Sequence, residues 1–202
     1  MTRSLRSDAA RNNARILDAA AQAFEEEGPG VSQGQIARRA GVGVATIYRR
    51  FRTREELIKA VAEHVFAADI ATAIIEGGPD PWDDLVATLS STVEAFAAHP
   101  VLVSLARESA VIDLDTRNEY AAAKDRVVRR ARDVGAIRPE ISGRDLTAVV
   151  IMALALVHSR KCDAQDIRRY LALLADGMRP TGHRLPEPGS IQAPPTCIQK
   201  PR

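Results

Sequence analysis

Apolar residues recur every three or four positions along most of the chain, which is the spacing of one face of an α-helix. The first such stretch covers residues 11–27 and places Ile16, Leu17 and Phe24 on one side. A half-buried strand would instead alternate apolar and polar residues, and no segment of the sequence shows that alternation convincingly. The pattern therefore predicts an all-α protein of about nine helices.

Glycine, proline and capping residues indicate where these helices begin and end. The Gly-Pro-Gly run at residues 28–30 ends the first helix, and Ser32 with Gln35 forms a capping box that opens the second. A second capping box begins at Thr53, and the Gly-Gly-Pro run at residues 77–79 is the clearest boundary in the chain. The predicted helices cover residues 11–27, 32–40, 44–51, 53–76, 81–98, 101–110, 117–134, 142–159 and 164–178.

The composition is that of a helical protein without a membrane span. Apolar residues make up 46% of the chain but aromatic residues only 4%, and the abundant alanine and leucine favour helices packed on helices. The longest apolar run, residues 148–157, is about half the length that crosses a bilayer. The start of the chain is polar and lacks the apolar segment of a signal peptide. We therefore expect a soluble cytoplasmic protein.

The charge distribution is more informative than the net charge of +2. Residues 38–54 contain six arginines and no acidic residue, whereas residues 64–178 contain 13 basic and 17 acidic side chains. The excess of positive charge therefore surrounds one short stretch, and an anionic partner such as nucleic acid is expected there.

That stretch, AGVGVATIYRRF at residues 40–51, has the pattern of a helix-turn-helix. Ile36, Val42 and Ile47 fall at spacings that bury the inner faces of two short helices, and Gly41 supplies the tight turn between them. A dinucleotide fingerprint would need a third glycine after a strand, and a P-loop would need Gly-Lys-Ser/Thr. Both are absent from the sequence, and an ordinary surface helix would not explain the apolar inner face.

In a helix-turn-helix the second helix enters the major groove with its N-terminal part nearest the base edges. Val44, Ala45 and Thr46 lie there and offer methyl groups to thymine, while hydroxyl and guanidinium groups further along suit phosphates. The candidate DNA-binding residues are Ser32, Gln33, Gly43, Val44, Ala45, Thr46, Tyr48, Arg49, Arg50 and Arg54. The arginines at positions 3, 6 and 11 serve either as an extra contact to DNA or as solubilising charge, and the sequence leaves both open.

The stretch VSQGQIARRAGVGVATIYRRFRTREELIKAV resembles the DNA-binding domain of the tetracycline repressor (TetR) family. The family's run of I-A-x-x-A-G-V, a small residue, T-[IL]-Y-x-[HR]-F and K/R-E-x-L is present in full, from Ile36 to Leu57. Two residues depart from the common pattern. Gly43 replaces the usual serine or threonine before the recognition helix and offers no hydroxyl to a phosphate, and Arg50 replaces a common histidine.

The resemblance implies a homodimeric regulator, most often a repressor, that binds a palindromic operator and is released by a small-molecule effector. It divides the chain into four segments. These are a flexible basic N-terminal arm at 1–10, the DNA-binding domain at 11–58 with its helix-turn-helix at 32–51, a helical effector-binding and dimerisation domain at 59–178, and a disordered proline-rich tail at 179–202. A protein of this kind would be associated with the nucleoid.

Two predicted helices, at 142–159 and 164–178, are the expected dimer interface, because the first is apolar almost all round. The effector site is expected among the helices from about Ala60 to Val134, although each polar or aromatic residue there is individually a more ordinary core, cap or surface residue. The candidate effector-binding residues are Trp82, Phe96, His99, Arg107, Tyr120 and, on the apolar helix, His158.

No enzymatic function, cofactor or metal is expected. None of the four histidines follows a glutamate by three positions, as a di-iron centre in a helical bundle would require. The cysteines, Cys162 and Cys197, form no CxxC pair and are expected to be free thiols. The main alternative is a helical ligand-binding or adaptor protein that keeps the fold without operator-specific DNA binding; the six clustered arginines argue against it.

Overall fold

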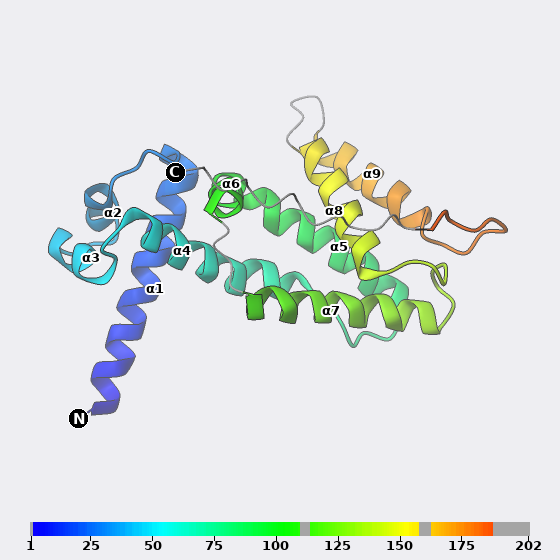
Figure 1. Ribbon diagram of the computed structural model, residues 1–202, viewed down its shortest axis with the longest axis horizontal. Helices are drawn as coiled ribbons and strands as arrows, with labels where there is room; N and C mark the ends of the chain where they lie inside the picture. The colour runs from blue at the N-terminus through cyan, green and yellow to red at the C-terminus, as the bar shows by residue number, and fades with distance from the viewer. Residues whose placement is uncertain (1, 110–113, 158–162, 188–202) are drawn as a thin grey trace, which may run out of the picture.

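The computed structural model describes residues 2–109, 114–157 and 163–187, and these residues form helices without any strand, which confirms the predicted all-α class. Figure 1 shows a small group of helices at one end of the molecule and a larger bundle at the other. The helices are α1 (Thr2–Glu27), α2 (Gln33–Arg39), α3 (Val44–Arg50), α4 (Arg54–Val65), α5 (Pro81–Ala98), α6 (Pro100–Ser109), α7 (Leu114–Asp133), α8 (Gly143–Val157) and α9 (Ala164–Asp176).

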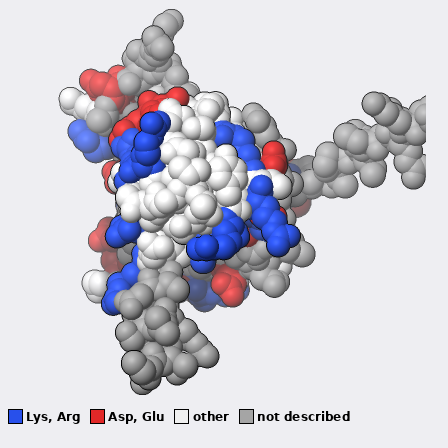
Figure 2. Space-filling view, turned by 90° about the vertical axis from the view of Figure 1, so that its left-hand side faces the viewer, with Lys and Arg blue, Asp and Glu red and all other residues white. Residues whose placement is uncertain are grey.

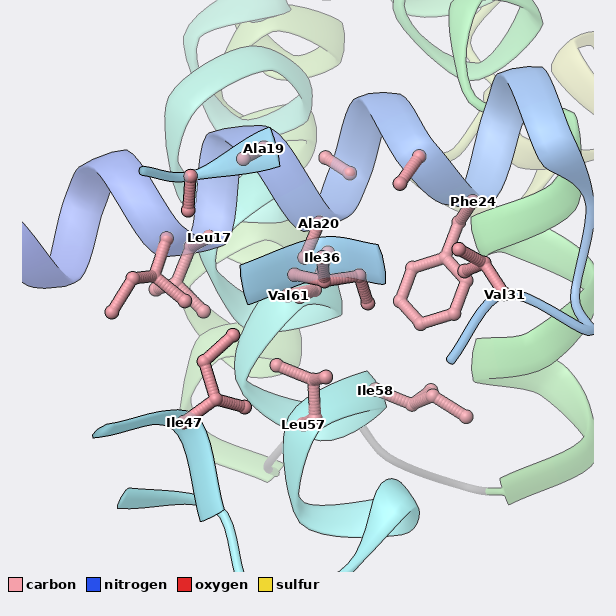
Figure 3. Close-up of a cluster of buried hydrophobic side chains, with 14 of the residues drawn as sticks. Leu17, Ala19, Ala20, Phe24, Val31, Ile36, Ile47, Leu57, Ile58 and Val61 are labelled. Carbon is pink, nitrogen blue, oxygen red and sulfur yellow. The ribbon is translucent and has the colours of Figure 1, made fainter. Parts of the chain in front are cut away.

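The helices pack around two separate apolar cores. The first core joins α1 to α4 and includes Leu102 from α6; the second joins α5, α7, α8 and α9. We call the first group the head and the second the bundle. In Figure 3, apolar side chains from all four head helices point toward one another, among them Phe24, Ile36, Ile47 and Leu57, which are completely buried. Burial of each such side chain stabilises the folded head by roughly 1.5–3 kcal/mol.

The first helix is longer than predicted. It begins at Thr2, whereas the sequence pattern starts the helix at residue 11 and assigns a flexible arm to residues 1–10. Polarity was the basis of that assignment, yet residues 2–27 contain neither glycine nor proline, so nothing in the sequence interrupts helical hydrogen bonding. The N-terminal half of α1 extends beyond the rest of the head, on the side where α3 lies (Figure 1).

The single helix predicted for residues 53–76 is broken in the structure. α4 ends at Val65 and continues as a π-helical turn, Phe66–Ile70, and a short 3-10 helix, Ala71–Ala73. Thr72 Oγ1 donates to the carbonyl oxygens of Ala68, at 2.7 Å, and Asp69, at 3.1 Å, in competition with regular helical bonding. The apolar periodicity could not show this break, because a one-residue shift in hydrogen bonding requires almost no change in the spacing of the apolar residues along the sequence.

Candidate nucleic-acid interface

The turn between α2 and α3 has the geometry that the sequence predicts. Ser32 and Gln35 form the complete capping box at the start of α2, and Gly41 adopts a positive φ of 65°. The N–H of Val42 donates to the carbonyl of Ala37 at 3.0 Å and closes the turn. Only glycine adopts such a φ at little cost, so this residue allows α3 to fold back across α2.

α3 presents one apolar side to the head core and another to solvent. Ile47 is completely buried against α1, α2 and α4, whereas Val44 is 43% exposed and Tyr48 is 52% exposed. Ala45 is exposed beside them. An exposed valine and tyrosine on a short helix have no packing role in the head, which leaves this side of α3 available for a partner.

Positive charge surrounds this uncharged patch. Figure 2 views the face that carries α2 and α3, and shows uncharged residues in the middle with lysine and arginine at several points around them. Arg38, Arg49 and Arg52 are exposed and form no ion pair with any carboxylate in the part of the chain that the structure describes. Arg39 is different, because it pairs with Glu26 at 2.5 Å and with Glu27 at 3.6 Å.

Two of the candidate DNA-binding residues have contacts inside the head. The buried Gln33 amide donates to the carbonyl oxygens of Phe51, at 3.0 Å, and Thr53, at 3.5 Å. Arg54 Nη1 donates to the carbonyl of Val31 at 2.6 Å, and its guanidinium carbon lies 5.4 Å from the centre of the Phe24 ring. These contacts hold the loops before α2 and α4 in place, so both side chains contribute to the fold of the head.

The remaining candidates lie at or near the surface of the head. Ser32 is exposed, and its hydroxyl caps α2. Gly43 is the N-cap of α3 and makes no side-chain capping bond, as expected from its missing hydroxyl. Thr46, Arg49 and Arg50 lie on the side of α3 that faces α1.

Sequence reasoning missed Asn12 and Asn13. These residues and Ile16 of α1 face Thr46, Arg49 and Arg50 of α3 across an open groove of about 420 Å³. The spacing of apolar residues along α1 contained an indication of this role. Asn13 lies three residues before Ile16, on the apolar stripe of α1, where an aliphatic residue would be expected if that position faced only the core.

The candidate effector residues do not form one site. Trp82 lies near the start of α5 with Arg179 stacked on its ring at 3.8 Å, whereas His99 lies at the opposite end of the same helix. At a rise of about 1.5 Å per residue these two are roughly 25 Å apart along α5. Phe96 packs against the bundle core. The side chain of Arg107 and all of His158 lie outside the described residues.

His99 and Tyr120 both contact the π-helical turn. His99 Nε2 lies 2.8 Å from Asp69 Oδ2, and the Tyr120 ring meets the Phe66 ring edge-on at 5.3 Å between centroids. Burial raises the pKa of the Tyr120 hydroxyl, and burial lowers the pKa of Lys124, whose amine lies 5.3 Å from the Tyr120 ring centre. The break after α4 is therefore packed by side chains from α5 and α7.

Among the described residues, no group of three or more His, Cys, Asp or Glu side chains is placed to hold a metal ion. None of the described helices is both long enough and apolar enough to span a bilayer.

Comparisons with known proteins agree with this geometry. Residues 16–61 match the family described as bacterial regulatory proteins, tetR family, and residues 80–180 match the C-terminal domain of SbtR-like transcriptional regulators. An HTH-type transcriptional regulator of Staphylococcus aureus is 39% identical over 54 residues, which cover 26% of this chain and only 29% of that protein.

Solved structures extend the similarity over most of the chain. A TetR transcription regulatory protein from Mycobacterium vanbaalenii is 30% identical, with 87% of this chain and 99% of that one covered and a TM-score of 0.65. A TetR transcriptional regulator from Streptomyces coelicolor is 29% identical, with 84% and 99% covered and a TM-score of 0.63. With its helix-turn-helix head and helical bundle, the chain belongs to the TetR family of transcriptional regulators.

Proposed function

We propose that this regulator binds a palindromic operator as a homodimer, represses transcription by occupying it, and is released by a small-molecule effector. The observation that carries the proposal is the outer side of α3, where Val44, Ala45 and Tyr48 are exposed beside arginines that have no acidic partner in the described chain. An exposed apolar patch ringed by cations suits the major groove, where thymine methyl groups lie between two rows of phosphates.

The proposed contacts follow from the position of each residue on α3. Val44 and Ala45 occupy the first turn, which lies nearest the base edges when a recognition helix enters the groove, and their methyl groups fit thymine. Tyr48 and Arg49 lie one turn further along, where a hydroxyl and a guanidinium reach phosphate oxygens. Arg38 and Arg52 add positive charge at the edge of the face.

The bundle supports the proposed homodimer. On α8, Ala148, Ile151, Met152 and Ala155 form an exposed apolar stripe, and Ile151 is 62% exposed. Leu173 on the neighbouring α9 is 67% exposed. A twofold partner placed on this surface would bury the stripe against its own copy and present two α3 helices to successive major grooves, about 34–36 Å apart.

The proposed effector response uses the connection between the two cores. α4 belongs to the head core, and the π-helical turn that follows it contacts side chains of α5 and α7 through Asp69 and Phe66. An effector that repacks this part of the bundle would shift α4 and change the spacing of the two α3 helices. The coupling would be reciprocal, so operator DNA would weaken effector binding by the same factor.

Selection from a pool of randomised duplexes, followed by fluorescence anisotropy with excess unrelated DNA, tests the proposal. We expect an enriched palindrome that binds two protomers and survives competition. A promoter that overlaps the selected site should then be silenced in transcription with purified polymerase. Enrichment of no sequence would refute operator binding, and stimulated transcription would refute repression.

A further inference from the structure

We infer that the groove between α1 and α3 binds the sugar–phosphate backbone of one DNA strand, with Asn12 and Asn13 as contact residues, an assignment that rests on the DNA-binding function proposed above. The groove is lined by Asn12, Asn13, Ile16, Thr46, Arg49 and Arg50.

The chemistry of the lining is that of an anion site. Every polar side chain that the structure describes in the lining carries a hydrogen-bond donor: two carboxamides, one hydroxyl and two guanidinium groups. Among the described side chains, no carboxylate lines the groove, and neither Arg49 nor Arg50 forms an ion pair with an acidic residue. Planar guanidinium groups beside amide donors suit the oxygens of a phosphate diester.

Asn12 is oriented so that its N–H donors have no acceptor among the described residues. Arg15 Nη2 donates to Asn12 Oδ1 at 3.3 Å, so the oxygen of this amide already has a partner. The opposite end of the amide carries two N–H groups, and these remain for another acceptor. Arg15 therefore acts as a positioning residue for Asn12.

Asn13 also lines the groove, with its side-chain oxygen enclosed by the protein. Its Oδ1 is buried and accepts no hydrogen bond from the described residues. Because this oxygen is buried, a ligand in the groove can reach only the nitrogen side of the carboxamide. The two N–H groups on that nitrogen are donors, which suit a phosphate oxygen.

The position of the groove matches the path of a DNA strand. A helix with its side chains is about 10–12 Å wide, and the major groove of B-DNA is about 12 Å wide, so a strand runs along each side of an inserted helix. The side of α3 that carries Thr46, Arg49 and Arg50 faces α1. A strand on that side passes over the groove, and the volume of about 420 Å³ is within the range that holds a nucleotide-sized group.

The test compares Asn13→Asp with the matched control Asn118→Asp, which makes the same amide-to-carboxylate change on the exposed surface of α7. Full-length proteins are titrated by anisotropy against a fluorescein-labelled random-sequence duplex and against the selected operator. We expect Asn13→Asp to weaken binding to both duplexes by about tenfold or more, because phosphates are common to all sequences. Asn118→Asp should bind as wild type does.

A second pair of variants separates the groove from general charge effects. Asn13→Ala should weaken binding by roughly threefold to tenfold without changing the salt dependence, because asparagine neutralises no phosphate. Arg49→Ala should weaken binding and flatten the slope of log K against log salt by about 0.9. Asn13→Ala also replaces Asn13→Asp if circular dichroism shows that the aspartate variant does not fold.

The outcomes test the groove assignment and the operator proposal separately. Equal binding of both aspartate variants to both duplexes, or wild-type affinity of Asn13→Ala, overturns the groove assignment while operator binding stands. Wild-type protein that does not distinguish operator from random duplex overturns the operator proposal, and the loss caused by Asn13→Asp on the random duplex still supports the groove. Absence of any DNA binding by the wild type overturns both.

Discussion

The head and the bundle differ in how their apolar residues are used. In the head, the large aliphatic residues of α1, α2 and α4 that the structure describes face a shared core, and the exposed large apolar residues among them lie on the outer side of α3. In the bundle, Ile151, Met152, Leu173 and Val134 are exposed at the surface as well. The described apolar surface of the head is therefore limited to the side of α3 that we propose to bind DNA, whereas the bundle has further apolar surface that suits a second protein.

The polar contacts between the two regions show how they are joined. The carboxylate of Glu25, on α1, accepts from the N–H groups of Val101, at 3.1 Å, and Leu102, at 2.9 Å, at the start of α6. α6 thus packs on the head although it follows α5 of the bundle.

The largest effect is expected from the head core. Ile47→Ala removes the side chain that anchors α3, and a cavity at a fully buried isoleucine lowers the free energy of unfolding by about 2–5 kcal/mol. Val44→Ala in the same helix changes an exposed residue and should stay within about 0.5 kcal/mol. Urea denaturation at one protein concentration measures both. Similar losses for the two variants would contradict the assignment of α3 faces.

A smaller effect is expected at the apolar surface of the bundle. Ile151→Asp places a carboxylate in each half of the proposed twofold interface, and we expect the dimer to dissociate about a hundredfold more readily. Sedimentation velocity over a range of concentrations measures the change. Val134→Asp, at a position 63% exposed and outside α8 and α9, is the control. If both variants remain dimeric, the interface lies elsewhere.

Two neighbouring arginines of the head, Arg54 and Arg52, are expected to differ in their effect on stability. Arg54→Ala leaves the carbonyl of Val31 without its donor and removes the contact with Phe24, so we expect the free energy of unfolding to fall by about 1–3 kcal/mol. Arg52→Ala, an exposed neighbour without an ion pair to a described carboxylate, should leave stability unchanged. Thermal melting measures the stability of both variants. An unchanged melting temperature for Arg54→Ala would show that this side chain does not stabilise the head.

The smallest effect concerns pH. Because burial raises the pKa of Tyr120 above its ordinary value near 10, the unfolded chain ionises before the folded protein does. This contribution to stability is complete below about pH 10 and is lost as the pH rises further. Tyr120→Phe should therefore lose less stability between neutral and alkaline pH than wild type, as measured by urea denaturation. Lys124 is present in both proteins, so its own titration cancels. Parallel curves would show that Tyr120 is not buried as described.

The sequence by itself determined the helical class, the family and the helix-turn-helix, because these depend on residues close together in the chain. The capping box at Ser32 and the turn at Gly41 involve contacts across a few residues, and the burial of Ile47 follows from its spacing to Ile36 and Val42; all appear in the structure as predicted. The exposure of Tyr48 follows in the same way from its position directly after Ile47.

Only the tertiary structure decided what depends on distant parts of the chain. An arginine or glutamine has the same local pattern whether it faces DNA or the protein, and Arg54 and Gln33 turn inward because the carbonyl oxygens of Val31 and Phe51 lie within reach. The break after α4 depends on Asp69 and Phe66 meeting α5 and α7, and the groove at Asn13 exists because α1 passes beside α3. Such contacts leave no periodic pattern in the sequence, because the fold decides how far apart in the chain the contacting residues lie.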